Sequence, residues 1–113
     1  MTCCDPSRST LAANVGALDV DFFRALCEPV RIELLTRMVE LGPADVGTIA
    51  EHLPQDRSVI SRHLQVLRDA GIVLARREGR HVVYEIDGPE MVSKLERLTD
   101  GVRQLVPLCC PGR

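Results

Sequence analysis

The sequence contains no tryptophan, one tyrosine and two phenylalanines among its 113 residues. Any hydrophobic core must therefore be built almost entirely from aliphatic side chains. No run of apolar residues approaches the roughly 18 that a membrane-spanning helix requires, and the first residues lack the apolar stretch of a secretory signal. We therefore expect one small cytoplasmic domain that does not associate with membranes.

Motifs of catalysis are missing as well. The chain has no Cys-x-x-Cys pair, no glycine-rich phosphate loop and no His-Glu-x-x-His zinc motif. Its histidines, His52, His63 and His81, fall in three different predicted elements. We expect a protein that is not an enzyme. One alternative is a thiol reductase or metalloid-transforming enzyme, which an assay for turnover of substrate would reveal. The other is a metal-carrying interaction module, which would not bind duplex DNA.

Positive charge is scarce overall, since the formal net charge is −2, and this argues against a uniformly basic nucleic-acid-binding protein. Between residues 57 and 81, however, six arginines outnumber two acidic residues, Asp69 and Glu78, so this segment has a net charge of +4. A local reversal of charge of this kind is typical of a DNA-binding surface.

Hydrophobic periodicity predicts three helices in the first half of the chain. They are expected over residues 19–26, 29–41 and 46–53. Pro29 favours the start of the second helix, because the N–H group that it lacks would have no partner in a first turn. Gly42 and Pro43 end this helix, and Pro54 ends the third.

A fourth helix is predicted from about Arg57 up to Gly71, where glycine is a suitable stop. Ile60, Leu64 and Leu67 recur at the spacing of one apolar helix face. Polar side chains fall away from that face, and they are Arg57, Ser58, Ser61, Arg62, Gln65 and Arg68. This helix is therefore predicted to bury one side and to present a polar, basic side to a partner.

A β-hairpin and a final helix are predicted to follow. The strands are expected near residues 72–77 and 81–86, and Gly79 supplies the positive φ that a tight turn needs. In the last helix, residues 91, 95, 98, 102 and 105 form an apolar stripe with heptad-like spacing. We expect this stripe to form a dimer, with packing against its own domain as the alternative, and we expect Pro107 to end the helix.

A helix, a short helix, a turn, a polar-faced helix and a basic hairpin follow one another in the order of a winged helix-turn-helix. The expected fold class is therefore mainly α with a small β-hairpin. A major groove accommodates one α-helix, so the polar-faced helix and the hairpin are predicted to contact double-stranded operator DNA. The predicted contact residues are Arg57, Ser58, Ser61, Arg62, His63, Gln65, Arg76, Arg77, Arg80 and His81. For His63, packing between helices is the alternative.

Three stretches in the same order resemble the ArsR/SmtB family of metal(loid)-responsive repressors. Residues 25–35 (ALCEPVRIELL) are similar to the family's second-helix signature, residues 61–73 to its recognition helix and residues 77–84 to its wing. The resemblance covers about residues 18–105. It implies a homodimer joined through the first and last helices. It also implies a repressor that leaves its operator when an inducer binds.

Two inducer sites familiar from this family are absent here. The region before the predicted recognition helix has no Cys-x-Cys, and residues 89–106 contain no histidine that could bind a zinc-like ion. Residues of these two regions therefore do not indicate an inducer.

The sequence also departs from the family pattern at three other positions. Arg57 and Val59 stand where small polar residues are common in the family, and Cys27 stands where a small residue is usual.

Four of the five cysteines form two vicinal pairs near the ends of the chain. Cys3 and Cys4 lie in a predicted flexible arm over residues 1–17, and Cys109 and Cys110 lie in a predicted tail over residues 107–113, on either side of the domain predicted over residues 18–106. Thiolate clusters select soft ions, and trivalent arsenic or antimony takes three sulfurs. The four cysteines are thus candidate ligands for As(III) or Sb(III) as inducer.

Other signals fit the same thiols. Cadmium, lead and mercury share the preference for sulfur, and accessible thiolates can also respond to oxidants or reactive sulfur species. The fifth cysteine, Cys27, is expected to pack as a small apolar residue, with a role in sensing as the alternative.

Overall fold

The structure is a computed structural model that describes residue 9, residues 12–13 and residues 19–109, apart from the side chains at 105 and 107–109. The chain divides into two compact units. One runs from Val20 to Met91, and the other combines residues up to Asp19 with those from Val92 onward. Most of the predicted arm over residues 1–17 lies outside the described residues, so its boundary stays a prediction.

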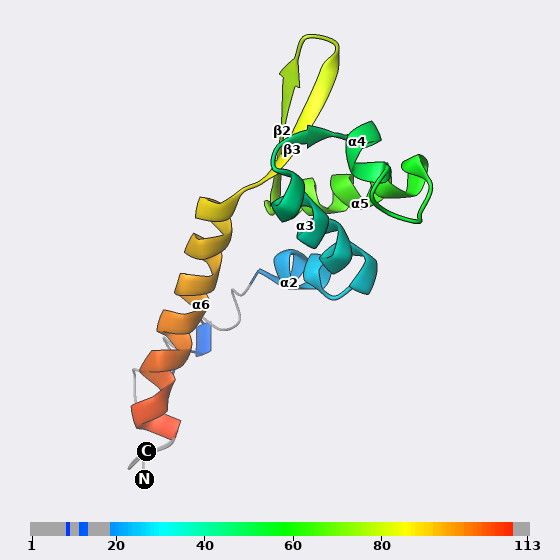
Figure 1. The fold of residues 1–113 in the computed structure, drawn as a ribbon. Coiled ribbons are helices and arrows are strands. Elements are labelled where there is room, and N and C mark those ends of the chain that lie inside the picture. Colours follow the sequence, from blue (N-terminus) through cyan, green and yellow to red (C-terminus); the bar gives the residue numbers. More distant parts are fainter. Residues whose placement is uncertain (1–8, 10–11, 14–18, 110–113) are drawn as a thin grey trace. The chain divides into compact units, whose positions relative to one another are not determined.

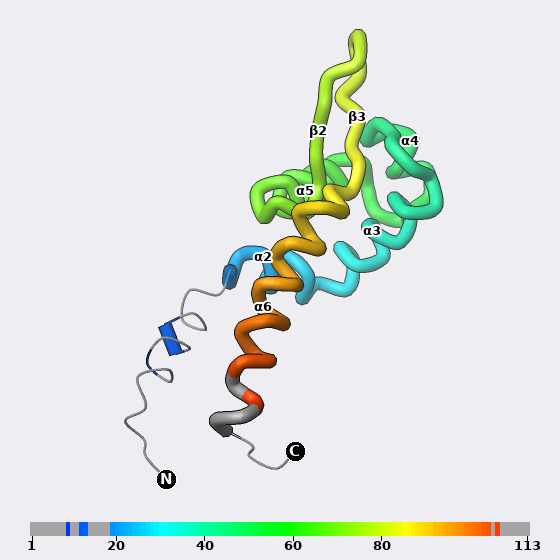
Figure 2. Tube along the Cα trace, turned by 90° about the vertical axis from the view of Figure 1, so that its left-hand side faces the viewer, coloured from blue at the N-terminus to red at the C-terminus, as the bar shows by residue number. Residues whose placement is uncertain are grey.

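The unit from Val20 to Met91 is a winged helix-turn-helix, as the sequence predicts (Figure 1). Its elements are α2 (Val20–Leu26), α3 (Pro29–Leu41), β1 (Ala44–Asp45), α4 (Val46–Ala50), α5 (Arg57–Asp69), β2 (Val73–Glu78) and β3 (His81–Ile86). In the view of Figure 2, β2 and β3 extend beyond the helices as a narrow two-stranded wing. The helix-turn-helix consists of α4, the turn after it and α5.

Proline and glycine set several of the element boundaries. Pro29 lies in the first turn of α3, and Gly42 ends that helix with φ 75°. The prediction that α4 extends to Leu53 is wrong, because the helix ends at Ala50. Pro54 disfavours helical backbone at the residue before it, so Leu53 adopts a turn instead, although its side chain is still buried.

The sheet has one more strand than the predicted hairpin. Its strand order is β1-β3-β2, and both pairings are antiparallel. In the register of β1 and β3, Ala44 pairs with Tyr84 and Asp45 with Val83. A strand of two residues has no periodicity that a sequence could reveal, and β1 is the link that joins the wing to the start of α4.

The core of this unit is aliphatic, with one aromatic pair. Leu34, Ile49, Ile60, Leu64 and Leu67 are each 0% exposed, so α3, α4 and α5 enclose a common interior. The rings of the two phenylalanines of α2 pack edge to face with centroids 5.1 Å apart. The side chains of Tyr84 and Ile86, which belong to the wing strand β3, pack against this core.

The last helix, α6, runs from Gly88 to Cys109. The prediction that Pro107 ends it is wrong, because two further residues are helical. A proline lacks the backbone N–H donor but keeps a helical φ. Near the end of a helix it therefore need not terminate the helix. Several apolar side chains of α6 are exposed, namely Val92, Leu95, Val102 and Val106. No helix in the described part of the chain is long and apolar enough to cross a membrane.

Candidate nucleic-acid interface

The amphipathic division predicted for α5 is confirmed. Its buried side chains are Ile60, Leu64 and Leu67, which fix the helix on the core. The exposed surface is mostly polar, with Val66 as an exposed apolar side chain, and it carries Arg57, Ser58, Ser61, Arg62, Gln65 and Arg68. One of these side chains is held locally, because Gln65 donates from Nε2 to Oδ1 of Asp69 at 2.8 Å. The rest of this surface can meet a partner without unpacking the helix.

His63 lies at a junction of three helices. Its half-buried ring places Nδ1 3.5 Å from an Nη1 atom of Arg31. The same guanidinium donates from Nε to the carbonyl of Ala25 at 2.7 Å, at the end of α2. His63 therefore contacts α3 through Arg31, as the packing alternative expects, and its contact with DNA stays a prediction.

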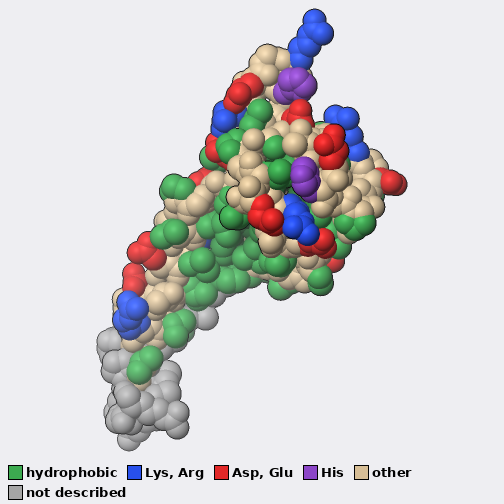
Figure 3. All heavy atoms as spheres, in the orientation of Figure 1, with side chains coloured by type: hydrophobic (Ala, Val, Ile, Leu, Met, Phe, Trp, Pro, Cys, Tyr) green, Lys and Arg blue, Asp and Glu red, His purple; other side chains and the backbone are tan. Residues whose placement is uncertain are grey.

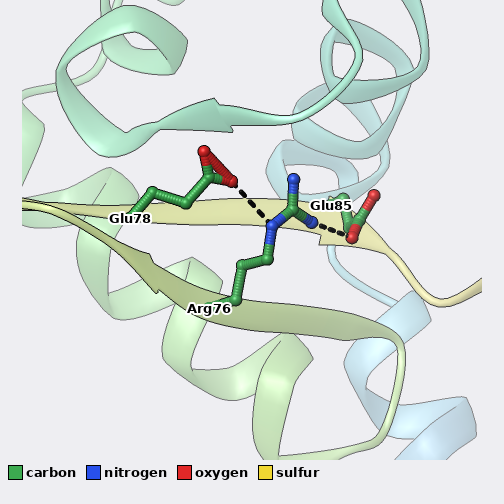
Figure 4. Close-up of polar contacts among 3 residues, drawn as sticks. All are labelled: Arg76, Glu78 and Glu85. Atoms are coloured by element: carbon green, nitrogen blue, oxygen red, sulfur yellow. Dashed lines mark hydrogen bonds and ion pairs between the residues drawn. The ribbon is translucent and has the colours of Figure 1, made fainter.

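The two adjacent arginines of β2 lie on opposite faces of the wing. In the β2–β3 register Arg76 pairs with Val83 and Arg77 with Val82, and neighbouring residues of a strand alternate between faces. Arg76 lies between two carboxylates, donating from Nε to Glu78 at 2.7 Å and from Nη1 to Glu85 (Figure 4). The hydrogen bond to Glu78, followed by the charges of both glutamates, raises the pKa of Arg76. Its charge is thus largely compensated within the wing.

Four other predicted or neighbouring basic side chains have no such compensation. Arg62 and Arg68 on α5, Arg77 on β2 and Arg80 in the turn of the wing are exposed. Within residues 19–109 none of the four forms an ion pair. Uncompensated guanidinium groups are the side chains best suited to phosphate oxygens.

Asp45 is a functional candidate that sequence reasoning missed. It precedes α4 directly, and its Oδ1 accepts the N–H of Thr48 at 2.8 Å, which caps that helix. Its Oδ2 lies 3.1 Å from Nδ1 of His81 on the wing. The Thr48 hydrogen bonds, with His81 and Arg57 nearby, hold the pKa of the Asp45 carboxyl below its usual value. An aspartate before a helix signals a cap, but only the β1–β3 pairing reveals its contact with the wing.

Acidic and basic side chains are mixed on the surface of this unit. On the face drawn in Figure 3, arginine, histidine and acidic side chains alternate over the wing and the helix-turn-helix. On this face the basic side chains therefore do not form one continuous patch.

The predicted metal ligands are not placed by the structure. Cys3, Cys4 and Cys110 lie outside the described residues, and α6 ends at Cys109. Among the described residues no group of three or more histidine, cysteine or acidic side chains could hold a metal ion.

The prediction that Cys27 packs in the interior is wrong, because its side chain is exposed. Since α2 ends at Leu26, Cys27 falls in the turn before α3 and off the apolar face.

The sequence and the fold resemble those of known proteins. Residues 28–74, from the start of α3 to the start of β2, match the family described as bacterial regulatory protein, arsR family. The HTH-type transcriptional regulator CmtR of Mycobacterium tuberculosis is 37% identical over 102 residues, which are 90% of this chain and 79% of CmtR. The chain belongs to the ArsR family. It is therefore a DNA-binding transcriptional regulator and not an enzyme.

Solved structures of ArsR-type regulators have the same architecture. One of them is described as a possible transcriptional regulator for arsenical resistance. It is 36% identical to this ArsR-family chain with a TM-score of 0.62, and the match covers 74% of this chain and 84% of the solved chain. Another is the homodimeric winged helix-turn-helix DNA-binding domain of a possible ArsR-family regulator from Mycobacterium bovis. It is 28% identical with a TM-score of 0.59, over 93% and 92% of the two chains.

Proposed function

We propose that the protein is a homodimeric repressor that binds operator DNA and leaves it when a thiophilic metalloid, As(III) or Sb(III), binds its terminal cysteines. The two vicinal pairs, Cys3-Cys4 and Cys109-Cys110, carry this proposal. The proposed repressor acts in the cytoplasm, where its thiols stay reduced and can bind the metalloid.

In the proposed complex each subunit inserts the polar side of α5 into a major groove. The side chains of Ser58, Ser61 and Arg62 provide hydrogen-bond donors and acceptors for base edges and phosphates. The wing contributes Arg77 and Arg80 to the phosphate backbone. A dimer reads two half-sites about 34–36 Å apart, and the homodimeric relative from Mycobacterium bovis supports this assembly.

The chemistry of the cysteines supports a soft inducer. Trivalent arsenic and antimony bind three sulfurs, and adjacent cysteines at one end of the chain can supply two of them while the other end supplies the third. Zinc structural sites more often use cysteines separated by two residues. The similar structure described as a possible regulator for arsenical resistance supports arsenic among these ions.

The inducer acts by linkage between two conformations. It shifts the dimer toward the state with low DNA affinity by binding that state more tightly. Couplings of this kind are typically about 1–3 kcal/mol, which corresponds to roughly 5–150-fold in affinity. Tying the two chain ends together would alter the spacing of the two recognition helices, and both half-sites could then no longer be occupied at once.

The test is a DNA-release assay with the variant Cys109→Ser/Cys110→Ser and the control Cys27→Ser, which also tests the alternative that the exposed Cys27 takes part in sensing. Fluorescence anisotropy would follow reduced protein on duplex DNA from upstream of its own coding sequence during titration with arsenite. We expect the double variant to bind DNA as the wild type does but to stay bound when arsenite is added, and the control to be released. Release of the double variant would exclude the C-terminal pair as the sensor.

The other thiophilic signals are separated in the same assay. Cadmium, lead, mercury and hydrogen peroxide would each replace arsenite in turn. Release by one of these, together with retention through many equivalents of arsenite, would keep the DNA-binding assignment and overturn the arsenic assignment.

A further inference from the structure

The carboxylate of Asp45 connects three parts of the DNA-binding unit. Asp45 is the last residue of β1, and its Oδ1 caps α4 through the N–H of Thr48 at 2.8 Å. Its Oδ2 contacts Nδ1 of His81, the first residue of β3, at 3.1 Å. Each oxygen thus has a partner of its own, one in the helix-turn-helix and one in the wing.

The first residue of the recognition helix lies near the same carboxylate. Arg57 is the first residue of α5, and its charge acts on Asp45. Its guanidinium carbon lies 3.7 Å from the position that a Cβ on Gly47 would take, and Oδ1 of Asp45 lies 3.6 Å from that position. Two of the predicted DNA contacts, Arg57 on the helix and His81 on the wing, therefore flank a single acidic side chain.

This arrangement has two opposing effects on DNA binding. A negative charge beside the DNA repels phosphates of any sequence. The same carboxylate holds His81 in a fixed relation to the first helix of the helix-turn-helix. The side chain of Asp45 is 29% exposed and that of His81 is 68% exposed, so the carboxylate is partly buried whereas its contact with His81 faces water. The first effect weakens all DNA binding, whereas the second favours only DNA that matches the fixed arrangement.

We propose that Asp45 is a specificity-determining positioning residue, which fixes the wing against the helix-turn-helix through His81 and lowers affinity for DNA that does not match. Removing its charge should therefore strengthen binding to arbitrary DNA while weakening discrimination. The expected partner is duplex DNA whose backbone fits the recognition helix and the wing at the same time.

The decisive variant is Asp45→Asn, because an amide oxygen still accepts the Thr48 N–H and preserves the cap of α4. Glu51→Gln is the matched control. Glu51 follows α4 directly, its side chain is exposed, and it has no side-chain partner within residues 19–109. Both substitutions remove one negative charge, so they differ only in the contacts that Asp45 makes. Thermal unfolding should show both variants folded, with melting temperatures close to that of the wild type.

The measurement is the specificity ratio, which is the dissociation constant for a shuffled duplex divided by that for a duplex of equal composition from upstream of the chain's own coding sequence. For Asp45→Asn we expect binding to the shuffled duplex to tighten about fivefold, the effect of one near-surface charge contact. The upstream duplex should gain less, so the ratio should fall by at least about threefold. Glu51→Gln should leave the ratio unchanged.

His81→Gln, alone and combined with Asp45→Asn, tests whether the effect runs through the wing. The glutamine removes the imidazole whose Nδ1 contacts Asp45, so the single variant should also lower the ratio and the double variant should lower it no further. An Asp45→Asn ratio equal to that of Glu51→Gln would overturn the proposal. So would a full Asp45→Asn effect that persists in the His81→Gln background, or a wild-type ratio for His81→Gln alone.

Discussion

At the scale of single residues, the arginines of this surface differ by their partners rather than by their positions in the sequence. Arg76 and Arg77 are adjacent and both were predicted to contact DNA, yet Arg76 is held by Glu78 and Glu85 whereas Arg77 has no ion pair within residues 19–109. A guanidinium already paired with two carboxylates gains little from a phosphate, because it must first give up its own partners.

This difference predicts unequal effects of two adjacent substitutions. Arg77→Gln should weaken DNA binding about tenfold and make its salt dependence less steep by about 1 for each phosphate that the arginine neutralises. Arg76→Gln should change DNA affinity less than about threefold, because its guanidinium is already engaged by Glu78 and Glu85. Anisotropy over a series of salt concentrations measures both effects. Equal reductions in affinity for the two variants would contradict the assignment.

The sequence could predict which residues of α5 are exposed, because a 3.6-residue period depends only on the chain. It could not predict that Arg76 is compensated, since Glu85 reaches it only through the β2–β3 register. For the same reason it missed the contact of Asp45 with His81. It left two alternatives for His63, and it could not predict the contact with Arg31, which lies 32 residues away in the chain.

At the scale of elements, the long periodic segments were predictable and the short ones were not. The prediction for α3 matches the structure residue for residue, from Pro29 to Leu41. The end of α4, the strand β1 and the passage of α6 beyond Pro107 were missed, because single hydrogen bonds and tertiary pairing decide them. The wing turn was predicted correctly, since Gly79 adopts φ 62°.

The turn of the wing allows a prediction about stability. Nothing lies within 4 Å of a Cβ built on Gly79, so Gly79→Ala adds no clash and only forces alanine into left-handed backbone. This should lower the free energy of unfolding by about 1 kcal/mol, and Gly79→Asn should cost less because asparagine tolerates this region. Urea denaturation measures both. Full stability of Gly79→Ala would show that the turn is not left-handed.

At the scale of the whole molecule, the proposed repressor requires a dimer. The exposed apolar side chains of α6 include Leu95 at 42% and Val102 at 47%, which are two of the five positions with heptad-like spacing. Met91, the first of the five, packs against the core of its own domain. An exposed stripe of this kind is typical of an association surface. The homodimeric relative from Mycobacterium bovis is consistent with it.

Charges placed on this stripe should separate the subunits. We expect Leu95→Glu/Val102→Glu to sediment as a monomer and to bind operator DNA at least about tenfold more weakly, because one subunit contacts only one half-site. Val39→Glu is the matched control, since Val39 is an apolar side chain of α3 that is 72% exposed. A dimeric double variant would exclude this face of α6 as the interface.

The central claim is that α5 presents its polar side to DNA, and Arg62 tests it most directly. The measurement is the slope of log Kd against log salt concentration on the upstream duplex, for the wild type, Arg62→Gln and the control Arg103→Gln, whose residue on α6 pairs with Asp100 at 3.2 Å. The account predicts that Arg62→Gln weakens binding and makes the slope less steep by about 1 for each phosphate that Arg62 neutralises, whereas Arg103→Gln leaves it unchanged. A wild-type affinity and slope for Arg62→Gln would contradict the account.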